Sequence, residues 1–426
     1  MSEIFLRTIR PDSLPDLLRE PVDPETTEQA QRIVDQVRAR GEAALRELAE
    51  LFREVTPGGS LVLTREELLP AWEGLAEEER ALLQRVKDRI EGFAQAQRDA
   101  LEDVTVPLPG GVAGHQVAPV ETAGCYAPGG RFPLPSTMLM TVATARAAGV
   151  KTVVAASPGA APITRAAAYI AGADMLLLCG GAHAIAALAH GVEGLVPRCD
   201  VVVGPGNRWV TAAKKIVSGS VGIDLLAGPS ELVVLADDTA DPDMVAVDLL
   251  AQAEHDPDAL PILVTVSEDL IAAVNSHLRG RLAKLPARET AEASLLNNGF
   301  AVLAADLDEA VDCVNRLAPE HLEVLTADAE RVSSRVRHYG GLFIGPGAAE
   351  VLGDYGAGPN HTLPTGNTAR YTGGLSVFNF LRVRTWMCID DTEAATGLVE
   401  DSAALARLEG LEAHALSALK RRSPSS

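Results

Sequence analysis

Two residues near the end of one predicted helix could hold a metal ion. Gln252 and His255 are three residues apart, so they share one face of a helical turn. The helix can begin at Asp241 and end at Asp256–Pro257, and the negative end of its dipole would favour a cation. Imidazole is a good zinc ligand and an amide oxygen a permissible one, but two ligands do not make a site. An ordinary polar helix end is the alternative for this pair.

An acid and a base stand next to each other in a second motif. Glu320 and His321 lie where a helical pattern meets the apolar segment 321–326. Neighbouring side chains at such a junction point in different directions, which suits two proton-transfer groups acting on one substrate from different sides. A polar loop beside a strand is the alternative.

The segment 353–366 is rich in Gly and Pro and presents Asp354 and His361. Its composition predicts a long loop. An acid and a histidine in a long ordered loop favour a functional role, although a simple connector is the alternative.

A further acid and histidine lie in the tail that follows Leu381. The pattern there predicts a helix over 402–420, in which Glu409 and His414 would lie about 140° apart, at about 100° per residue. The two can face one point only if Gly410 interrupts the helix, and otherwise they are a solvated acid and a surface histidine. The tail is too short for a core of its own, so it should pack on something larger, such as another subunit.

Three glycine-rich turns at 128–130, 179–183 and 204–207 lie near strand-like segments. Open α/β sheets bind ligands at such strand ends, and a helix N-terminus offers free N–H groups to a phosphate. The G-x-G-x-x-G pattern of dinucleotide-binding turns is absent from the sequence. Tight turns that need glycine are therefore an equal alternative to nucleotide binding.

Alternating helical and strand-like segments must position these residues. From 136 to 219 and from 232 to 345, short apolar runs are followed by helical patterns. Such runs are typical of parallel strands buried on both faces, so the sequence predicts an α/β protein with two such units. Helical patterns also cover 24–53 and 66–101, and 112–125 is predicted to be extended.

The composition excludes several classes of protein. The 426 residues are 47% hydrophobic but only 4% aromatic, which is typical of α/β proteins filled by Ala, Val and Leu. The net charge of −21 argues against nucleic acid or an anionic membrane as the main partner. No apolar run reaches the roughly 18 residues of a membrane span, and the start has no signal-like apolar region. Five scattered cysteines favour reduced thiols in the cytoplasm and a metal held by His, Asp, Glu or amide oxygen.

Taken together, the motifs resemble the histidinol dehydrogenase family along nearly the whole chain. Seven blocks occur in the family's order with suitable spacing, which makes chance similarity implausible. They are YAPGG (126–130), GPGN (204–207), AGPSE (227–231), LLAQAEHD (249–256), APEHLE (318–323), GDYGAGPNHTLPT (353–365) and EGLEAH (409–414).

The resemblance implies a zinc- and NAD-dependent enzyme. Such an enzyme oxidises L-histidinol to L-histidine through a bound L-histidinaldehyde, with two NAD⁺ reduced, as the last step of histidine biosynthesis. The resemblance also implies two Rossmann-like domains without the usual dinucleotide fingerprint, in an intertwined homodimer that shares its active sites.

The resemblance further implies roles for individual residues. Glu320 and His321 would be the catalytic acid–base pair. Zinc would be bound by Gln252, His255, Asp354 and the partner subunit's His414. The substrate contacts would be Ser230, Gln252, His255, His321, Asp354, His361, Glu409 and His414. The NAD contacts would be Tyr126, Asn207 and His183, the last standing where other members of the family have glutamine.

The expected domain boundaries follow the same pattern. They are an N-terminal arm at 1–23, a larger α/β domain with the zinc and catalytic residues at 24–125 and 231–380, a second α/β domain with the NAD contacts at 126–230, and a tail at 381–426 that packs on the partner subunit.

Three other functions stay open at this point. A relative of the same superfamily that oxidises another alcohol, such as a sulfonated propanediol, would lose the imidazole-binding residues, whereas Glu409, His361 and His414 are present. A zinc hydrolase could use the same ligands but would not need the turns at Tyr126 and Asn207. A non-catalytic binding module would have no use for an acid–base pair beside a metal.

Overall fold

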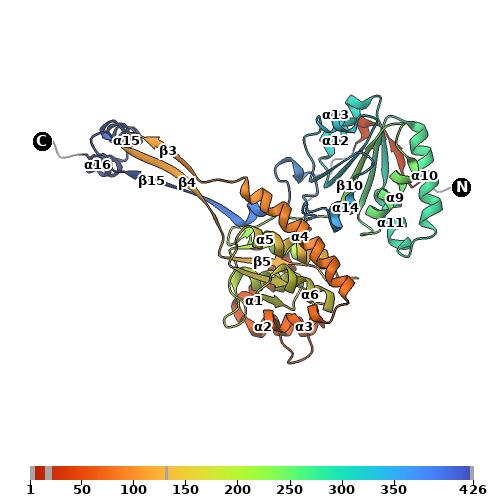
Figure 1. Ribbon diagram of the computed structural model, residues 1–426, viewed down its shortest axis with the longest axis horizontal. Coiled ribbons are helices and arrows are strands. Elements are labelled where there is room, and N and C mark those ends of the chain that lie inside the picture. The colour runs from red at the N-terminus through yellow and green to blue at the C-terminus, as the bar shows by residue number, and fades with distance from the viewer. Residues whose placement is uncertain (1–4, 15–21, 130–132, 423–426) are drawn as a thin grey trace.

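The computed structural model describes residues 5–14, 22–129 and 133–422. Two α/β units make up the body, and a long thin arm extends from it to one side (Figure 1). The α/β class with parallel sheets is therefore confirmed. Residues 1–4 and 15–21 of the expected N-terminal arm, and Gly130 of the first glycine-rich turn, lie outside the described residues.

The first unit contains a six-stranded sheet with the order β2-β7-β6-β5-β8-β9. Its paired neighbours are parallel except β2, which runs antiparallel to β7. Its central strands are buried on both faces, as their continuous apolar sequences predict. The strands are β2 (Val62–Thr64), β5 (Thr122–Tyr126), β6 (Thr152–Ala156), β7 (Met175–Leu177), β8 (Val201–Val203) and β9 (Gly222–Ile223).

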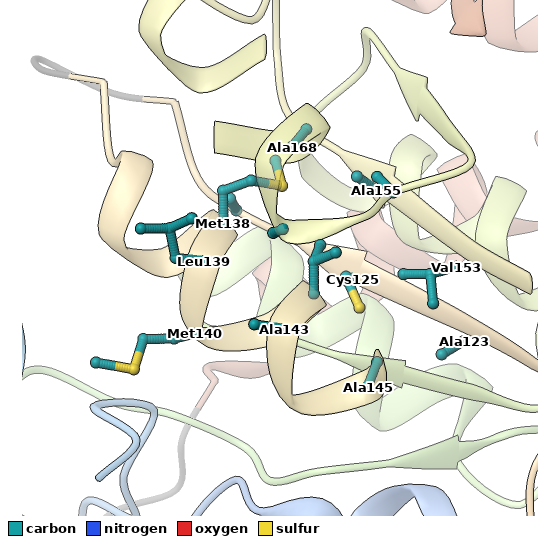
Figure 2. Packing of buried hydrophobic residues seen from close by; sticks show 14 of the residues in the cluster. Ala123, Cys125, Met138, Leu139, Met140, Ala143, Ala145, Val153, Ala155 and Ala168 are labelled. Atoms are coloured by element: carbon teal, nitrogen blue, oxygen red, sulfur yellow. The ribbon is translucent and has the colours of Figure 1, made fainter. Parts of the chain in front are cut away.

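Helices cover both faces of this first sheet. On one face α3 to α6 share a hydrophobic cluster with the strands, and Figure 2 shows α5 placing Met138 and Ala143 close to strand residues such as Cys125. On the other face α1, α2, α7 and α8 share a second cluster. The helices are α1 (Pro24–Arg40), α2 (Glu42–Leu51), α3 (Arg65–Glu73), α4 (Glu77–Asp99), α5 (Pro135–Ala147), α6 (Pro162–Ala171), α7 (Gly181–His190) and α8 (Arg208–Val217).

The second unit contains a six-stranded parallel sheet with the order β1-β12-β11-β10-β13-β14. Helices α9 to α11 cover one face, and α12 and α13 cover the other. The strands are β1 (Arg7–Ile9), β10 (Glu231–Ala236), β11 (Leu260–Thr265), β12 (Phe300–Leu303), β13 (His321–Leu325) and β14 (Gly341–Ile344). The helices are α9 (Pro242–Ala253), α10 (Glu268–Leu282), α11 (Arg288–Asn298), α12 (Leu307–Leu317), α13 (Ala329–Ser333) and α14 (Glu350–Tyr355).

The arm is a three-stranded antiparallel sheet with two helices at its far end (Figure 1). It consists of β3 (Val104–Leu108), β4 (Gly111–Pro119) and β15 (Leu381–Ile389), followed by α15 (Thr396–Leu408) and α16 (Glu412–Leu419). Gly410, at φ +78°, separates the two helices, so the helix predicted over 402–420 is interrupted there. Large apolar side chains stay exposed along it: Val106, Val383, Met387, Leu405, Leu408 and Leu416.

The grouping of segments differs from the boundaries expected from the sequence, which join 24–125 to the catalytic unit. In the structure α1 to α4 and β2 pack on the first sheet, and β5 lies within that sheet between β6 and β8. The N-terminal segment adds β1 to the edge of the second sheet. Helical periodicity shows which face of α1 to α4 is apolar but not which sheet covers that face. Within the described ranges, no helix is both long and apolar enough to cross a membrane.

Two adjacent leucines of α4 test its packing on the first unit. Leu83 is buried in the cluster with α5, whereas Leu82 is half exposed. Leu83→Ala should lower the free energy of unfolding by about 2–5 kcal/mol, because it leaves a cavity in the core. Leu82→Ala should change it by about 0.5 kcal/mol or less. Urea unfolding measures both values, and equal losses would contradict this packing.

Candidate active site

Polar residues gather at the edge of the second sheet where its strands begin. Glu320 and His321 lie at the start of β13, and Ser230 directly precedes the neighbouring strand β10. The crossover helix α9 runs back along the parallel sheet, so its last turn, which contains Gln252, ends at the same edge. The fold therefore brings together residues that are up to 91 positions apart in the chain.

His321 is buried among carboxylates at this edge. Its Nδ1 lies 3.7 Å from Glu350 Oε1 and 3.6 Å from Glu320 Oε2, and its Nε2 lies 3.5 Å from Asp354 Oδ1. Nδ1 is also 3.2 Å from the backbone oxygen of Glu231, so an N–H at this position can donate to that carbonyl. Glu350 and Asp354 are four residues apart on α14 and therefore share one face.

Glu320 has defined partners of its own. The Ser230 hydroxyl donates to Glu320 Oε2 at 2.6 Å, and the backbone N–H of Glu231 donates to the same oxygen at 2.9 Å. Burial raises the pKa of Glu320, while the nearby His321 and the Ser230 hydroxyl act in the opposite direction. Glu320 is therefore a fixed carboxyl group with increased basicity.

Burial and charge act against each other at this edge. Burial favours the neutral imidazole, but the carboxylates of Glu350, Glu320 and Asp354 outweigh it and raise the pKa of His321 to about 10. Burial raises the pKa of Glu350 to about 8. Burial also acts to raise the pKa of Asp354, but the contact with His321 lowers it below its usual value. One imidazolium thus faces several acidic groups. These groups would also stabilise a second positive charge at this edge.

The same edge contains donors that fit a divalent cation. One nitrogen of His255 and one oxygen each of Glu350 and Asp354 lie within 4.8 Å of one another. Gln252 is fully buried, and neither atom of its amide has a hydrogen-bond partner among the described residues. An unpaired buried amide is costly, and a cation that accepts its oxygen as a ligand removes part of that cost. Imidazole, carboxylate and amide donors suit zinc.

His361 connects the two units beside this cluster. Its Nδ1 lies 3.0 Å from the backbone oxygen of Asp354, and its Nε2 lies 3.1 Å from the hydroxyl of Thr137 on α5. Burial lowers the pKa of His361, so the neutral ring donates from Nδ1 and accepts at Nε2. The segment 353–366 is a loop only in part, because Asp354 belongs to α14.

Tyr126 and Asn207 lie at the carboxyl ends of adjacent strands in the first sheet. Tyr126 ends β5, and its hydroxyl accepts from the backbone N–H of Gly181 at 3.2 Å. Asn207 follows β8 and caps α8, where its side-chain oxygen accepts from the N–H groups of Trp209 at 3.0 Å and Val210 at 3.2 Å. The carboxyl edge of an open parallel sheet is where nucleotides bind.

His183 is buried in the first unit and has a carboxylate partner. Its Nε2 lies 2.7 Å from Glu54 Oε2, and Glu54 Oε1 accepts from the N–H of Gly180 at 3.0 Å. Its ring stacks on Phe52, with 5.5 Å between centroids. The Cys179 sulfur lies within 4.8 Å of one Glu54 oxygen and one His183 nitrogen, but both Glu54 oxygens are engaged and burial raises the pKa of the Cys179 thiol. The contact of His183 with NAD stays a prediction.

Glu409 and His414 do not join the site of their own chain. Both are exposed, and they belong to the helical pair at the far end of the arm (Figure 1). Any contact between them and a cluster like that around His321 needs a second copy of the chain.

Sequence reasoning missed three acids of these clusters. Glu350 stands four residues before Asp354, and this helical spacing could have identified it. Glu231 is buried beside Glu320, and its Oε1 accepts from the N–H of Gly366 at 2.8 Å. Glu54 carries no local signal, because its partner His183 is 129 residues away in the sequence.

Known proteins match both the sequence and the fold. The family model for histidinol dehydrogenase matches residues 19–422. The chain belongs to the histidinol dehydrogenase family. It is 44% identical to the histidinol dehydrogenase of Parasynechococcus marenigrum over 395 residues, which cover 91% of this chain and 89% of that protein. It is also 44% identical to that of Thermus thermophilus over 401 residues, covering 94% and 95%.

A solved structure agrees with this assignment. The crystal structure of histidinol dehydrogenase from Elizabethkingia anophelis is similar to this chain with a TM-score of 0.90 and 28% sequence identity, over 98% of both chains. The resemblance carried by the seven sequence blocks is thereby confirmed. In this member of the histidinol dehydrogenase family, the blocks 249–256, 318–323 and 353–365 meet at one edge of the second sheet.

Two threonines of α5 test the link between the units. Thr137 and Thr141 are both buried, but the Thr137 hydroxyl meets His361 whereas that of Thr141 donates to the helix carbonyl of Thr137 at 2.8 Å. Thr137→Val should lower the free energy of unfolding by about 1–3 kcal/mol, because it leaves a buried ring nitrogen unpaired. Thr141→Val should cost less than about 1 kcal/mol, because its carbonyl partner already accepts a helix bond. Urea unfolding compares the two, and a larger loss for Thr141→Val would contradict the link.

Proposed function

We propose that this chain oxidises L-histidinol to L-histidine through a bound L-histidinaldehyde, with two NAD⁺ reduced, as the last step of histidine biosynthesis. Membership of the histidinol dehydrogenase family supports the substrate, the nicotinamide cofactor and the pathway. The observation that carries the mechanism is the buried imidazole of His321 beside the carboxyl group of Glu320. Oxidation of an alcohol to an acid needs both a proton acceptor for the hydroxyl and an activated water.

His321 accepts the hydroxyl proton as the neutral ring, because a cation bound beside Asp354 would offset the carboxylates that otherwise raise its pKa. Its Nδ1 faces the backbone oxygen of Glu231, which holds a proton on that nitrogen and leaves Nε2 for the substrate. Nε2 is buried and makes no hydrogen bond to the described residues. As Nε2 takes the proton, the carbon–oxygen double bond of the aldehyde forms and hydride leaves for the first NAD⁺.

Glu320 activates the water for the second oxidation. The Ser230 hydroxyl and the Glu231 N–H fix one carboxylate oxygen, so the other can take a proton from water. The water oxygen bonds to the aldehyde carbon as Glu320 takes one of its protons, and the resulting hydrate anion loses hydride to the second NAD⁺ to give the acid. Burial raises the pKa of Glu320, which brings its basicity closer to what proton transfer at neutral pH requires.

Zinc is the cation we assign to the cluster at the start of β13. Its ligands are Gln252, His255 and Asp354, with the partner subunit's His414, and the unpaired amide of Gln252 supports this set. When bound, zinc orients the imidazole and amine of histidinol and supplies positive charge beside Asp354. The residues that contact the substrate are Ser230, Gln252, His255, His321, Asp354, His361, Glu409 and His414.

A homodimer with exchanged arms supplies the missing residues. Glu409 and His414 are exposed at the end of an arm whose apolar side chains, such as Met387 and Leu408, have little cover within the chain. A twofold axis would place each arm on the body of the other copy, bury these side chains and complete both sites at once.

NAD binds at the carboxyl edge of the first sheet in this proposal. Tyr126 and Asn207 lie there on adjacent strands, and His183 is the third predicted contact. Five unpaired cysteines suit a reducing compartment, so we place the reaction in the cytoplasm. Oxidation of a sulfonated propanediol is not favoured, because the relatives reported above are histidinol dehydrogenases and His361 is positioned beside the cluster.

An NADH assay with purified protein tests the function. We expect about two NADH per L-histidinol, one for each hydride transfer, with activity lost on chelation and restored by zinc. Strong turnover of a sulfonated diol without turnover of histidinol would contradict the proposal.

The metal ligands are tested by metal content, independently of activity. His255→Ala and Asp354→Asn should each lose at least about tenfold in zinc affinity, because each removes one of few ligands. Glu254→Gln removes a neighbouring exposed acid and should keep the affinity. Plasma mass spectrometry after dialysis measures zinc per chain, and full retention in both ligand variants would contradict the assignment.

A further inference from the structure

A buried ion pair lies beneath one of the glycine-rich turns of the first unit. Lys214 of α8 and Asp224, which follows β9, form a salt bridge, and their side chains are only 2% and 0% exposed. Lys214 is among the largest fully buried side chains of the described residues. An apolar pair of similar volume is often at least as stable as a buried ion pair, so stability alone does not explain these two residues.

Both charged groups also bind the same glycine. The Lys214 ammonium group donates to the backbone oxygen of Gly204 at 2.8 Å. The backbone N–H of Gly204 donates to Asp224 Oδ2 at 2.7 Å. Asp224 Oδ1 in turn pairs with Lys214 and accepts from the N–H of Leu225 at 2.7 Å. The ion pair therefore holds the first residue of the turn 204–207 by both of its backbone polar groups.

Gly204 lies directly against the backbone of Tyr126. Strands β5 and β8 are paired with Cys125 opposite Val203, so Gly204 stands beside Tyr126 at the next position. A Cβ on Gly204 would lie 1.9 Å from the Tyr126 carbonyl oxygen, and its φ of +117° is one that other residues rarely adopt. Any shift of Gly204 thus changes the spacing between Tyr126 and the turn that ends at Asn207.

We infer that Lys214 and Asp224 are positioning residues for NAD. Their hydrogen bonds to Gly204 fix the distance between Tyr126 and Asn207, and neither side chain contacts the cofactor. The inference rests on the proposed function, which places NAD contacts at Tyr126 and Asn207. It assigns a role to a charge pair that lies outside the catalytic cluster.

Two paired substitutions separate positioning from folding. Lys214→Met with Asp224→Leu removes both charges and both hydrogen bonds to Gly204 but keeps apolar volume. Lys214→Gln with Asp224→Asn removes the charges but keeps a donor and an acceptor for Gly204. Arg146→Met with Asp174→Leu is the control, because it removes another, more exposed ion pair of the first unit whose hydrogen bonds lie away from Gly204. Steady-state kinetics give KM for NAD and for histidinol separately, and thermal unfolding verifies the fold.

The Met/Leu variant should raise KM for NAD by about tenfold while leaving KM for histidinol unchanged. The Gln/Asn variant and the Arg146/Asp174 control should keep KM for NAD within about threefold of the parent. A folded Met/Leu variant whose KM for NAD rises less than about fivefold, or whose two KM values rise together, would overturn the inference. If the Met/Leu variant does not fold, Lys214→Met with Asp224→Asn replaces it under the same criterion, because it removes the donor to the Gly204 carbonyl and leaves no unpaired buried charge.

Asn207→Asp distinguishes this inference from the proposed function. Aspartate keeps the cap of α8 but loses the amide N–H that could donate to NAD. If Asn207→Asp leaves KM for NAD unchanged, the proposed NAD site is wrong. If Asn207→Asp raises it and the Met/Leu variant does not, the NAD site stands and the positioning role is wrong.

Discussion

Several buried acidic groups surround one imidazole where β10 and β13 begin, and the chemistry of the site depends on how their charge is balanced. Glu320, Glu350 and Asp354 surround one imidazole, that of His321, and the amide of Gln252 lies unpaired close by in the fold. Carboxylates in a low-dielectric interior are tolerated only when they are paired or when they bind a cation. Burial raises the pKa of Glu350, the neighbouring carboxylates raise the pKa of His321, and a cation fits beside Asp354.

The functional residues of the two sheets lie at opposite ends of their strands. Tyr126 and Asn207 lie where strands of the first sheet end, whereas Glu320 and His321 lie where a strand of the second sheet begins. The hydrogen bond between His361 and Thr137 ties the catalytic edge to α5 of the first unit. In the proposed reaction, hydride must pass from a substrate on one unit to NAD on the other. A fixed contact between the units keeps the substrate and NAD at a constant distance and orientation.

The sequence alone predicts the individual helices and strands better than it predicts how they pack together. Continuous apolar runs such as 262–267 and 321–326 mark buried parallel strands, and most of the expected helices and strands are present. The boundary around 24–125 differs, because an amphipathic helix does not show which sheet will cover it. The sequence does not indicate the sheet of the arm, because β4 pairs with β15 across more than 260 residues.

The same distinction holds for the site. His255, Glu320, His321 and Asp354 stand in motifs whose spacing predicts chemistry, and the structure brings them to one edge. Roles for Ser230 and Tyr126 came from the resemblance alone. Long-range partners such as Glu54 and His183 carry no signal in the sequence, because only the folded chain brings them together.

Each proposed active site is built from two copies of the chain. The most direct test of this sharing mixes two inactive variants, His255→Ala and His414→Ala, under conditions of demonstrated subunit exchange. A heterodimer with exchanged arms contains one site that carries both defects and one site with neither. NADH production should therefore return, with about a quarter of the parent's sites intact after random exchange. No recovery despite proven exchange would contradict a shared site.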